Sequence, residues 1–362
     1  MKKVFIAATK QNDGKTTASL GLICNFQNKF KKVGFIKPIG QRYLEEEGLK
    51  IDEDSVLIEE VCGIKSGLKD MSPIAVERGF TEKYIARPDR KSISRQIEAA
   101  FRRVSKGQDL VIIEGTGHAG VGSVFDHSNA KVARLLGSKV IIISSGGIGR
   151  PIDEIVLNKA LFEKEGVKVL GVIVNKVLPD KFEKINQMVR KGLQRKGIEV
   201  LGVIPYDPML ARPTIEQIFQ EGDFELLAGA DFLERSVSQV IVGAMEPHDA
   251  VKYITVDSLI ITPGDREDMI MAVLSSFRDQ DNKKLKVAGV ILSGGIAPET
   301  PIMHLLIKAE IPVLLAKSDT YDVATSIHDM TIKIRPQDLN KIEAVKKLVK
   351  ENVNFDKILR GM

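Results

Sequence analysis

The chain has 362 residues, of which 43% are hydrophobic and 28% are charged, and a formal net charge of +5 at pH 7. This composition predicts a soluble globular protein of two domains and excludes an intrinsically disordered chain. The charge is too small to indicate nucleic-acid binding, and no apolar segment is long enough to span a bilayer, so we expect neither a nucleic-acid nor a membrane partner.

The first part of the chain alternates short apolar runs with helical stretches, which is typical of a parallel sheet covered by helices. A strand is predicted at 3–8, and a helix is predicted to begin within ATKQNDGKTT, residues 8–17. Further strands are predicted at 33–37, 110–115, 139–144, 169–175 and 200–205. Because these runs are continuously apolar, both faces of the sheet should be covered. We therefore expect a doubly wound, mostly parallel α/β domain over residues 1–210.

A second, smaller α/β domain is predicted over residues 211–335, after a boundary marked by three prolines. Its strands are predicted at 239–244, 258–264, 287–295 and 311–316. Residues 336–362 carry apolar side chains at helical spacing, so we expect an amphipathic helix packed on the second domain. The most basic run, 181–197, also has helical spacing, which predicts a solvated cationic helix face.

The stretch ATKQNDGKTT lies between a predicted strand and a predicted helix, which is the context that a phosphate-binding loop requires. In such a loop, backbone N–H groups at the helix start bind phosphate, Lys15 reaches the outer phosphates and the Thr16 hydroxyl ligates Mg²⁺. The sequence therefore predicts a bound nucleotide with Mg²⁺. The nucleotide-binding residues are predicted to be Thr9, Lys10, Gln11, Asn12, Asp13, Gly14, Lys15, Thr16 and Thr17.

Two carboxylates and a lysine lie at the predicted ends of strands, the edge at which open α/β sheets bind ligands. Glu114 follows a buried strand, and Asp54 begins a predicted helix. Because Mg²⁺ prefers oxygen ligands, we predict that Thr16, Asp54 and Glu114 hold the metal. Asp54 has an alternative role as the cap of its helix. Lys37 closes the second strand and would stabilise phosphate oxygens or a carboxylate substrate, unless it is a solvated strand-end lysine.

The segments ATKQNDGKTT, IKPIG, DEDS, IIEGTGH and GVIVNKV, in this order, resemble dethiobiotin synthetase and the related cobyrinate amide synthetases over residues 1–210. The resemblance implies that the nucleotide is ATP. It also implies that Lys15 and Lys37 are the catalytic cations. The amidotransferase relatives use a cysteine nucleophile in a C-terminal domain, and this sequence has no cysteine after Cys62, so we do not expect glutamine-dependent amidation.

The same resemblance implies that Asn175 contacts adenine and that the loop around Pro205 helps to close the base pocket. In that family, threonine commonly occupies the position of Thr9, so this residue fits the pattern. Gln11 stands where the family has a second threonine, and this difference argues against the family's substrate chemistry but not against ATP binding. Lys10 coincides with the signature lysine of the dimerising ATPases related to MinD and ParA, which reaches the partner's nucleotide. Its alternative role is that of a loop cation near phosphate.

The second domain resembles the DRTGG domain. PGDREDMI supplies Asp265 and Arg266, and VILSGGIAP supplies the run 293–295, Ser-Gly-Gly. Physically, Arg266 would bind an anion at a helix start, and 293–295 resemble an anion nest. The alternative is that these are capping and turn residues of a subunit interface. The domain order resembles the N-terminal region of long bacterial phosphate acetyltransferases, and because their catalytic domain is missing here, acetyl transfer is not predicted.

Cys24 and Cys62 are too few and too far apart along the chain for a disulfide framework or a thiolate zinc site, which favours a cytoplasmic protein. Two functions remain open. The first is a Mg²⁺-dependent ATP-binding protein or slow ATPase with a regulatory or metabolite-sensing role, for a small-molecule metabolite, as a homodimer or higher homo-oligomer. We favour it because Gln11 departs from the synthetase loop and because the domain pairing resembles a regulatory region. The alternative is an ATP-dependent ligase that activates a carboxylate or carbamate.

Overall fold

The computed structural model describes residues 1–46, 48–276 and 287–362. These residues form two compact units. The first unit comprises Met1–Asp207 and Ile334–Met362, and the second comprises Pro208–Lys333. The second unit is thus inserted in sequence between two parts of the first.

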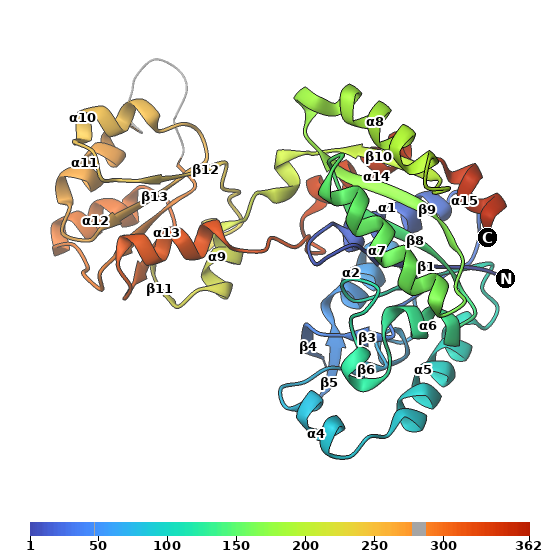
Figure 1. Ribbon diagram of the computed structural model, residues 1–362. Helices are drawn as coiled ribbons and strands as arrows, with labels where there is room; N and C mark the ends of the chain where they lie inside the picture. Colours follow the sequence, from blue (N-terminus) through green and yellow to red (C-terminus); the bar gives the residue numbers. More distant parts are fainter. Residues whose placement is uncertain (47, 277–286) are drawn as a thin grey trace. The chain divides into compact units, whose positions relative to one another are not determined.

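A parallel six-stranded sheet forms the centre of the first unit (Figure 1). Its order is β10-β9-β8-β1-β7-β2, so the chain winds in both directions from β1. These strands are β1 (Lys2–Ala8), β2 (Val33–Ile36), β7 (Leu110–Glu114), β8 (Lys139–Ser145), β9 (Val169–Val177) and β10 (Val200–Pro205). All six coincide with the predicted strands, and their residues are almost all buried, as the continuous apolar runs predict.

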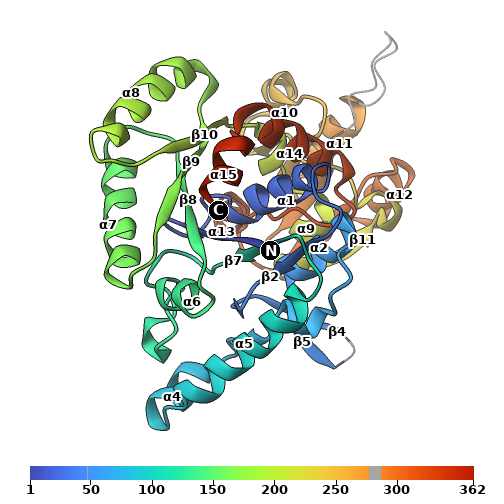
Figure 2. The same ribbon diagram turned by 90° about the vertical axis from the view of Figure 1, so that its right-hand side faces the viewer.

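Helices cover both faces of this sheet (Figure 2). On one face, α7 (Arg150–Lys164) and α8 (Phe182–Gln194) pack against β8, β9 and β10. On the other face lie α1 (Lys15–Phe26), α14 (Leu339–Asn352) and α15 (Phe355–Gly361). The remaining helices of this unit are α2 (Glu53–Cys62), α3 (Leu68–Met71), α4 (Phe80–Ala86), α5 (Arg90–Ser105) and α6 (Asn129–Leu135), with 3₁₀ turns at Ser123–Phe125 and Pro179–Lys181.

Two small strand pairs, which the apolar pattern does not predict, complete the first unit. They are the parallel pair β3 (Ile39–Gly40) with β6 (Ile74–Ala75), and the antiparallel pair β4 (Tyr43–Glu46) with β5 (Leu49–Asp52). The second pair ends at Asp52, directly before α2, and therefore positions the start of that helix.

The C-terminal helix α14 packs on α1, so the prediction that it packs on the second domain is wrong. Gly21 of α1 allows the two helices to approach closely, because a Cβ at that position would overlap the side chain of Val349. The Asn25 side chain also donates a hydrogen bond to the Lys346 carbonyl, at 3.1 Å. An amphipathic pattern predicts which face of a helix is buried but not which sheet receives it, and this explains the error.

The second unit has its own five-stranded sheet, in the order β11-β15-β14-β13-β12. All neighbouring strands are parallel except β11, which pairs antiparallel with β15. The strands are β11 (Phe224–Ala228), β12 (Gln239–Val242), β13 (Ser258–Pro263), β14 (Gly289–Ser293) and β15 (Val313–Ala316). The helices are α9 (Ile215–Glu221), α10 (Pro247–Ala250), α11 (Glu267–Ser276), α12 (Thr300–Lys308) and α13 (Thr320–His328), with 3₁₀ turns at Pro208–Ala211, Ala230–Phe232 and Val251–Tyr253. The four predicted strands are present, and β11 was not predicted.

Helix α8 exposes its basic side chains and buries only Val189 and Leu193, so the predicted solvated cationic face is confirmed. In the described parts of the chain, no helix combines the length and apolar character needed to cross a membrane.

Candidate phosphate-loop and carboxylate site

The loop between β1 and α1 is organised around the buried carboxylate of Asp13. Asp13 Oδ2 accepts a hydrogen bond from the Thr9 hydroxyl at 2.6 Å and from the Lys10 backbone N–H at 3.0 Å. Gly14 then adopts a left-handed conformation, with φ 92°, and α1 begins at Lys15. This conformation favours glycine, so the Gly-Lys-Thr sequence is what turns the loop into the helix.

Strand β9 holds the same loop from the side. The Asn175 side-chain N–H donates to the Asp13 carbonyl at 3.0 Å, and Lys176 Nζ donates to the Asn12 carbonyl at 2.7 Å. A Cβ on Gly14 would overlap the Asn175 amide. Asn175, expected at adenine, is therefore buried against the loop backbone, and Lys176 is a supporting residue that the sequence did not indicate.

The predicted loop residues differ in their exposure to solvent. Lys10 and Gln11 are exposed, whereas Lys15, Thr16 and Thr17 are half-buried in the first turn of α1. Pro205, at the end of β10, is also half-buried. Helix α7 also supports the loop, since the Asn158 side chain donates to the Thr9 carbonyl at 3.3 Å. The sequence does not predict this contact.

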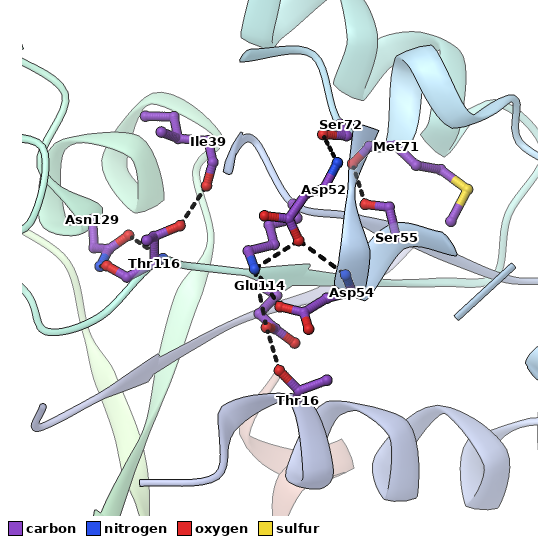
Figure 3. A network of polar contacts seen from close by, with 11 residues as sticks. Thr16, Ile39, Asp52, Asp54, Ser55, Met71, Ser72, Glu114, Thr116 and Asn129 are labelled. Carbon is purple, nitrogen blue, oxygen red and sulfur yellow. Dashed lines mark hydrogen bonds and ion pairs between the residues drawn. The ribbon is translucent and has the colours of Figure 1, made fainter. Parts of the chain in front are cut away.

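A buried cluster of one lysine and three carboxylates lies beside the start of α1 (Figure 3). Lys37 Nζ lies 2.8 Å from Asp52 Oδ1 and 4.0 Å from Glu114 Oε1, and it forms an ion pair with Asp54. The Thr16 hydroxyl donates to Glu114 Oε1 at 3.3 Å. The structure thus brings together all four residues predicted for this edge, Thr16, Lys37, Asp54 and Glu114. Because Lys37 is 6% exposed, its alternative as a solvated lysine is wrong.

Asp52 also belongs to this cluster, although no sequence motif predicts it. Asp52 caps α2, because its Oδ1 accepts the Asp54 backbone N–H at 3.0 Å. The Asp52 N–H in turn donates to the Ser72 hydroxyl at 3.0 Å. The alternative that Asp54 caps the helix is therefore wrong, and its carboxylate faces Lys37 instead. The signal was a second aspartate, two residues earlier, at the cap position.

The buried charges shift one another's protonation equilibria. Burial lowers the pKa of Lys37, but Asp54, Asp52 and Glu114 oppose this more strongly, so the net pKa is raised. Burial raises the pKa of Glu114 to about 7, with Asp54 acting in the same direction and Lys37 against it. Burial also lowers the pKa of Lys15, which Glu114 partly offsets. The cluster contains more carboxylate than ammonium groups, and burial is the largest cause of the shifted pKa values of Glu114 and Lys15.

The oxygen atoms of the cluster suit Mg²⁺ shared with a phosphate ligand. Glu114 Oε2 and Asp52 Oδ2 are buried and, among the described residues, accept no hydrogen bond. Within those same residues, no three or more His, Cys, Asp or Glu side chains are grouped so that they would hold a metal by themselves. Mg²⁺ in nucleotide sites commonly uses one or two carboxylates and completes its shell with water and phosphate oxygens. The residues present fit that kind of site.

The glycine-rich segment after β7 contains a buried histidine, His127. Its Nε2 lies 2.9 Å from the Ser94 hydroxyl and its Nδ1 lies 2.8 Å from the Phe125 carbonyl oxygen. Burial lowers the pKa of His127, and Arg90 and Lys131 act in the same direction, while the hydrogen bond to the Phe125 carbonyl and the charge of Asp126 only partly oppose them. His127 is therefore held neutral by the fold, which makes it a structural residue.

This burial predicts a pH-dependent contribution to stability. An unfolded histidine has a pKa near 6.5 and gains a proton more readily than buried His127. The stability contributed by the neutral ring is therefore present above about pH 6.5 and is lost as the pH falls through the depressed folded value. We expect the fall in Tm between about pH 7.5 and 5 to be smaller in His127→Gln than in wild type. The control is His304→Gln, because His304 is exposed. If the fall in Tm were reduced equally in that variant, the pH dependence would not come from the burial of His127.

In the second unit, the predicted anion nest is wrong. The N–H groups of Gly294 and Gly295 donate to the carbonyls of Ser318 and Ala316, both at 2.8 Å. Arg266 is paired with Asp268 at 2.8 Å and donates to the Gly243 and Met245 carbonyls. The recurring residues of this domain therefore stabilise its turns in the present structure, as the alternative interpretation partly anticipated.

Comparisons with known proteins agree with this two-part organisation. Residues 2–214 match the AAA domain family AAA_26, and residues 217–330 match the DRTGG domain. The phosphate acetyltransferases of Pseudomonas putida and Synechocystis are 27% and 26% identical over 371 and 367 residues, and each alignment covers 98% of this chain and 51% of the relative. The E. coli phosphate acetyltransferase is 20% identical over 379 residues, with 98% and 52% covered.

Two solved structures are also similar to parts of the chain. The MinC:MinD complex of Aquifex aeolicus is 16% identical, with 58% of this chain and 84% of that chain covered and a TM-score of 0.38. The CBS and DRTGG domains of the Clostridium perfringens pyrophosphatase, complexed with diadenosine tetraphosphate, are 18% identical, with 49% and 85% covered and a TM-score of 0.27. Because both TM-scores are low, the fold assignment depends on the sheets described above.

The predicted resemblance to the N-terminal region of phosphate acetyltransferases is confirmed, and the chain spans about half the length of these relatives. The order of its two parts is that of a P-loop domain followed by a DRTGG domain. The chain belongs to the AAA domain family AAA_26 over residues 2–214, with a DRTGG domain at 217–330.

Proposed function

We propose that the first unit binds ATP together with Mg²⁺ and turns it over slowly, in a regulatory or metabolite-sensing role shared with the DRTGG domain. The observation that carries this proposal is the contact between Thr16 of the loop and buried Glu114, at 3.3 Å. It links a phosphate-binding loop to a carboxylate that has an unpaired oxygen, and metal-nucleotide binding needs both.

The start of α1 supplies the phosphate-binding groups. A helix start leaves backbone N–H groups unpaired and carries a partial positive charge, which favours an anion. Lys15 lies in this first turn, partly buried, so that its charge would act in a region of reduced solvent screening. Of the predicted metal set, Thr16 and Glu114 would hold Mg²⁺, which would neutralise charge on the outer phosphates, whereas Asp54 is paired with Lys37. The remaining carboxylates, Asp52 and Asp54, are held in place by Lys37.

This pairing of Lys37 favours the regulatory proposal over the ligase alternative. In a ligase, Lys37 would stabilise a transferred phosphoryl group or the substrate carboxylate. Here it is engaged by two carboxylates and nearly buried. Contact with a substrate would require Lys37 to leave these partners, at the cost of exposing them unpaired.

Exposed Lys10 supports the further proposal of nucleotide-linked assembly. Its backbone N–H is fixed by Asp13, while its side chain lies at the surface beside the phosphate loop. We propose that this exposed lysine contacts the nucleotide held by a second copy. If ATP promotes a dimer through Lys10, Lys10→Ala abolishes the ATP-dependent shift in molar mass measured by light scattering. A dimer that forms equally well in the variant would refute this role.

Lys15→Ala is expected to weaken ATP binding about ten- to hundredfold. A hydrogen bond to a charged group contributes about 1.5–3 kcal/mol, and about 1.4 kcal/mol corresponds to tenfold in Kd. The measurement is titration calorimetry with Mg-ATP. Lys184→Ala, which removes an exposed lysine from α8, is the matched control and should bind as wild type does. Unchanged affinity in Lys15→Ala, or no nucleotide binding by wild type, would refute the proposal.

Turnover measurements separate the regulatory and ligase functions. Wild type is assayed for ATP hydrolysis with and without diaminopelargonate and bicarbonate, the substrates that the dethiobiotin synthetase resemblance implies. We expect slow turnover that these compounds leave unchanged. Rapid, substrate-dependent formation of dethiobiotin would overturn the regulatory proposal in favour of the ligase.

A further inference from the structure

The only two cysteines of the chain meet in space, although 38 positions separate them in sequence. Cys24 Sγ lies 3.3 Å from Cys62 Sγ, and both are free thiols. The sequence predicts only that two cysteines cannot build a disulfide framework or a thiolate zinc site, and it does not predict this contact, because separation along the chain says little about distance across two packed helices. Cys24 lies in the last turn of α1, and Cys62 is the last residue of α2.

The two thiols are not equivalent. Cys24 is half-buried, whereas Cys62 is only 9% exposed. The hydrogen bond that Cys24 shares with Cys62, in which either sulfur can be the donor, lowers the pKa of Cys24; the nearby Lys346 ammonium acts in the same direction, while burial and Glu343 oppose it. The same hydrogen bond, together with burial, raises the pKa of Cys62. Since the thiolate is the reactive form, Cys24, which is the more accessible thiol and has the lowered pKa, is the partner that reacts first.

A pocket of about 680 Å³ opens beside Cys24. Its wall includes Lys346, Lys347 and Lys350 of α14, together with Glu343 and Glu351. The volume is within the range of small-molecule sites, about 300–1,000 Å³. A small peptide disulfide with carboxylate groups therefore has both space and partner cations next to the reactive thiol.

The geometry also permits the two sulfur atoms to bond. A disulfide requires an S–S distance of about 2.05 Å, so the sulfurs must approach by only about 1.3 Å. Both lie at helix ends, where the last turn adjusts more easily than the middle of a helix. The Gln27 side chain, which donates to the Cys62 carbonyl at 2.7 Å, already ties these two ends together.

We propose that Cys24 and Cys62 form a redox-active dithiol that closes into an intramolecular disulfide between α1 and α2, with a glutathione-type disulfide as the oxidant. The Cys24 thiolate attacks one sulfur of the oxidant, which breaks its S–S bond and releases one thiol. Cys62 then loses its proton and attacks Cys24 Sγ, which releases the second thiol. The protein loses two hydrogen atoms in total, and one oxidant disulfide is reduced to two thiols.

The test is to incubate the full chain with glutathione disulfide and to follow intact mass and free thiol content. Wild type should lose both free thiols and two hydrogens in mass, without retaining glutathione. Cys62→Ser should retain one glutathione on Cys24, because the thiol that resolves the mixed disulfide is missing. Cys24→Ser should react at least about tenfold more slowly than Cys62→Ser, because Cys62 is buried and protonated.

Three outcomes would overturn the proposal. These are wild type that keeps both thiols free, wild type that retains glutathione on Cys24, and a disulfide between two chains on a non-reducing gel. Cys62→Ala replaces Cys62→Ser if the serine variant does not give a cooperative thermal transition. Because the readouts are mass and thiol content, they do not depend on nucleotide binding, and the proposed function can fail or succeed separately.

Discussion

Removal of residues 336–362 is expected to unfold the first unit, although this segment lies far along the chain from the six strands it stabilises. It contributes Ile342, Val345, Val349, Val353 and Ile358, all of which are buried. Each fully buried aliphatic side chain is worth about 1.5–3 kcal/mol, so the five together are comparable to the whole stability of a domain, about 5–15 kcal/mol. A chain ending at Arg335 should therefore show no cooperative transition for this unit in thermal denaturation.

A point substitution tests the same packing in the full chain. Val349 lies against Gly21, and Val349→Asp would place a carboxylate between α14 and α1. We expect a loss of several kcal/mol and a large fall in Tm, since the charge is buried without a partner. Leu339→Asp is the matched control, because it makes the same kind of change on the same helix at a side chain that is 70% exposed. Equal effects of the two substitutions would show that α14 does not pack as described.

Lys37→Met is expected to destabilise the first unit by about 3–5 kcal/mol, the usual cost of breaking a buried ion pair from one side. The substitution keeps the size of the side chain but leaves Asp52, Asp54 and Glu114 without their common cation. Burial already raises the folded pKa of Glu114 to about 7 and that of Asp52 above its ordinary value, and loss of the lysine should raise both further. For such groups, stability is lost as the pH rises through the folded pKa, so the defect should be larger at pH 8 than at pH 6.

The matched control for this prediction is Lys50→Met. Lys50 pairs with Glu77 at 2.7 Å, but both side chains are partly exposed, at 33% and 46%. An ion pair of this kind contributes at most about 1 kcal/mol. Chemical denaturation of the two variants and wild type gives the comparison. If Lys37→Met is as stable as Lys50→Met, the lysine does not compensate the carboxylates and the described cluster is wrong.

The sequence predicts the strands well, because a buried parallel strand requires a continuous apolar run and such runs are conspicuous. It also predicts the phosphate loop and the edge at which Thr16, Lys37, Asp54 and Glu114 meet, since the ends of parallel strands share one edge of a sheet. The short pair β4 and β5 was missed because its strands are partly exposed and have no apolar run. Asp52, at the end of β5, was missed with it.

The other features that the sequence does not predict are contacts between distant segments. The pairing of α14 with α1, and that of Cys24 with Cys62, depend on how helices from different parts of the chain pack, and local periodicity carries no information about this. The supposed anion nest failed for a related reason. Its glycine N–H groups donate to the carbonyls of Ala316, the last residue of β15, and of Ser318, which follows that strand, and no local motif indicates these partners.

The placement of α14 has a consequence for synthesis on the ribosome. Strands β1 to β10 emerge early, yet the helix that covers α1 follows only after all of Pro208–Lys333 has been made. At about 5–20 residues per second, this delay is on the order of ten seconds. During this time the nascent chain carries an uncovered apolar face around Gly21. The second unit is one continuous segment, so its synthesis is complete before that of the first unit. We therefore expect the second unit to finish folding first, although synthesis of the first unit starts earlier.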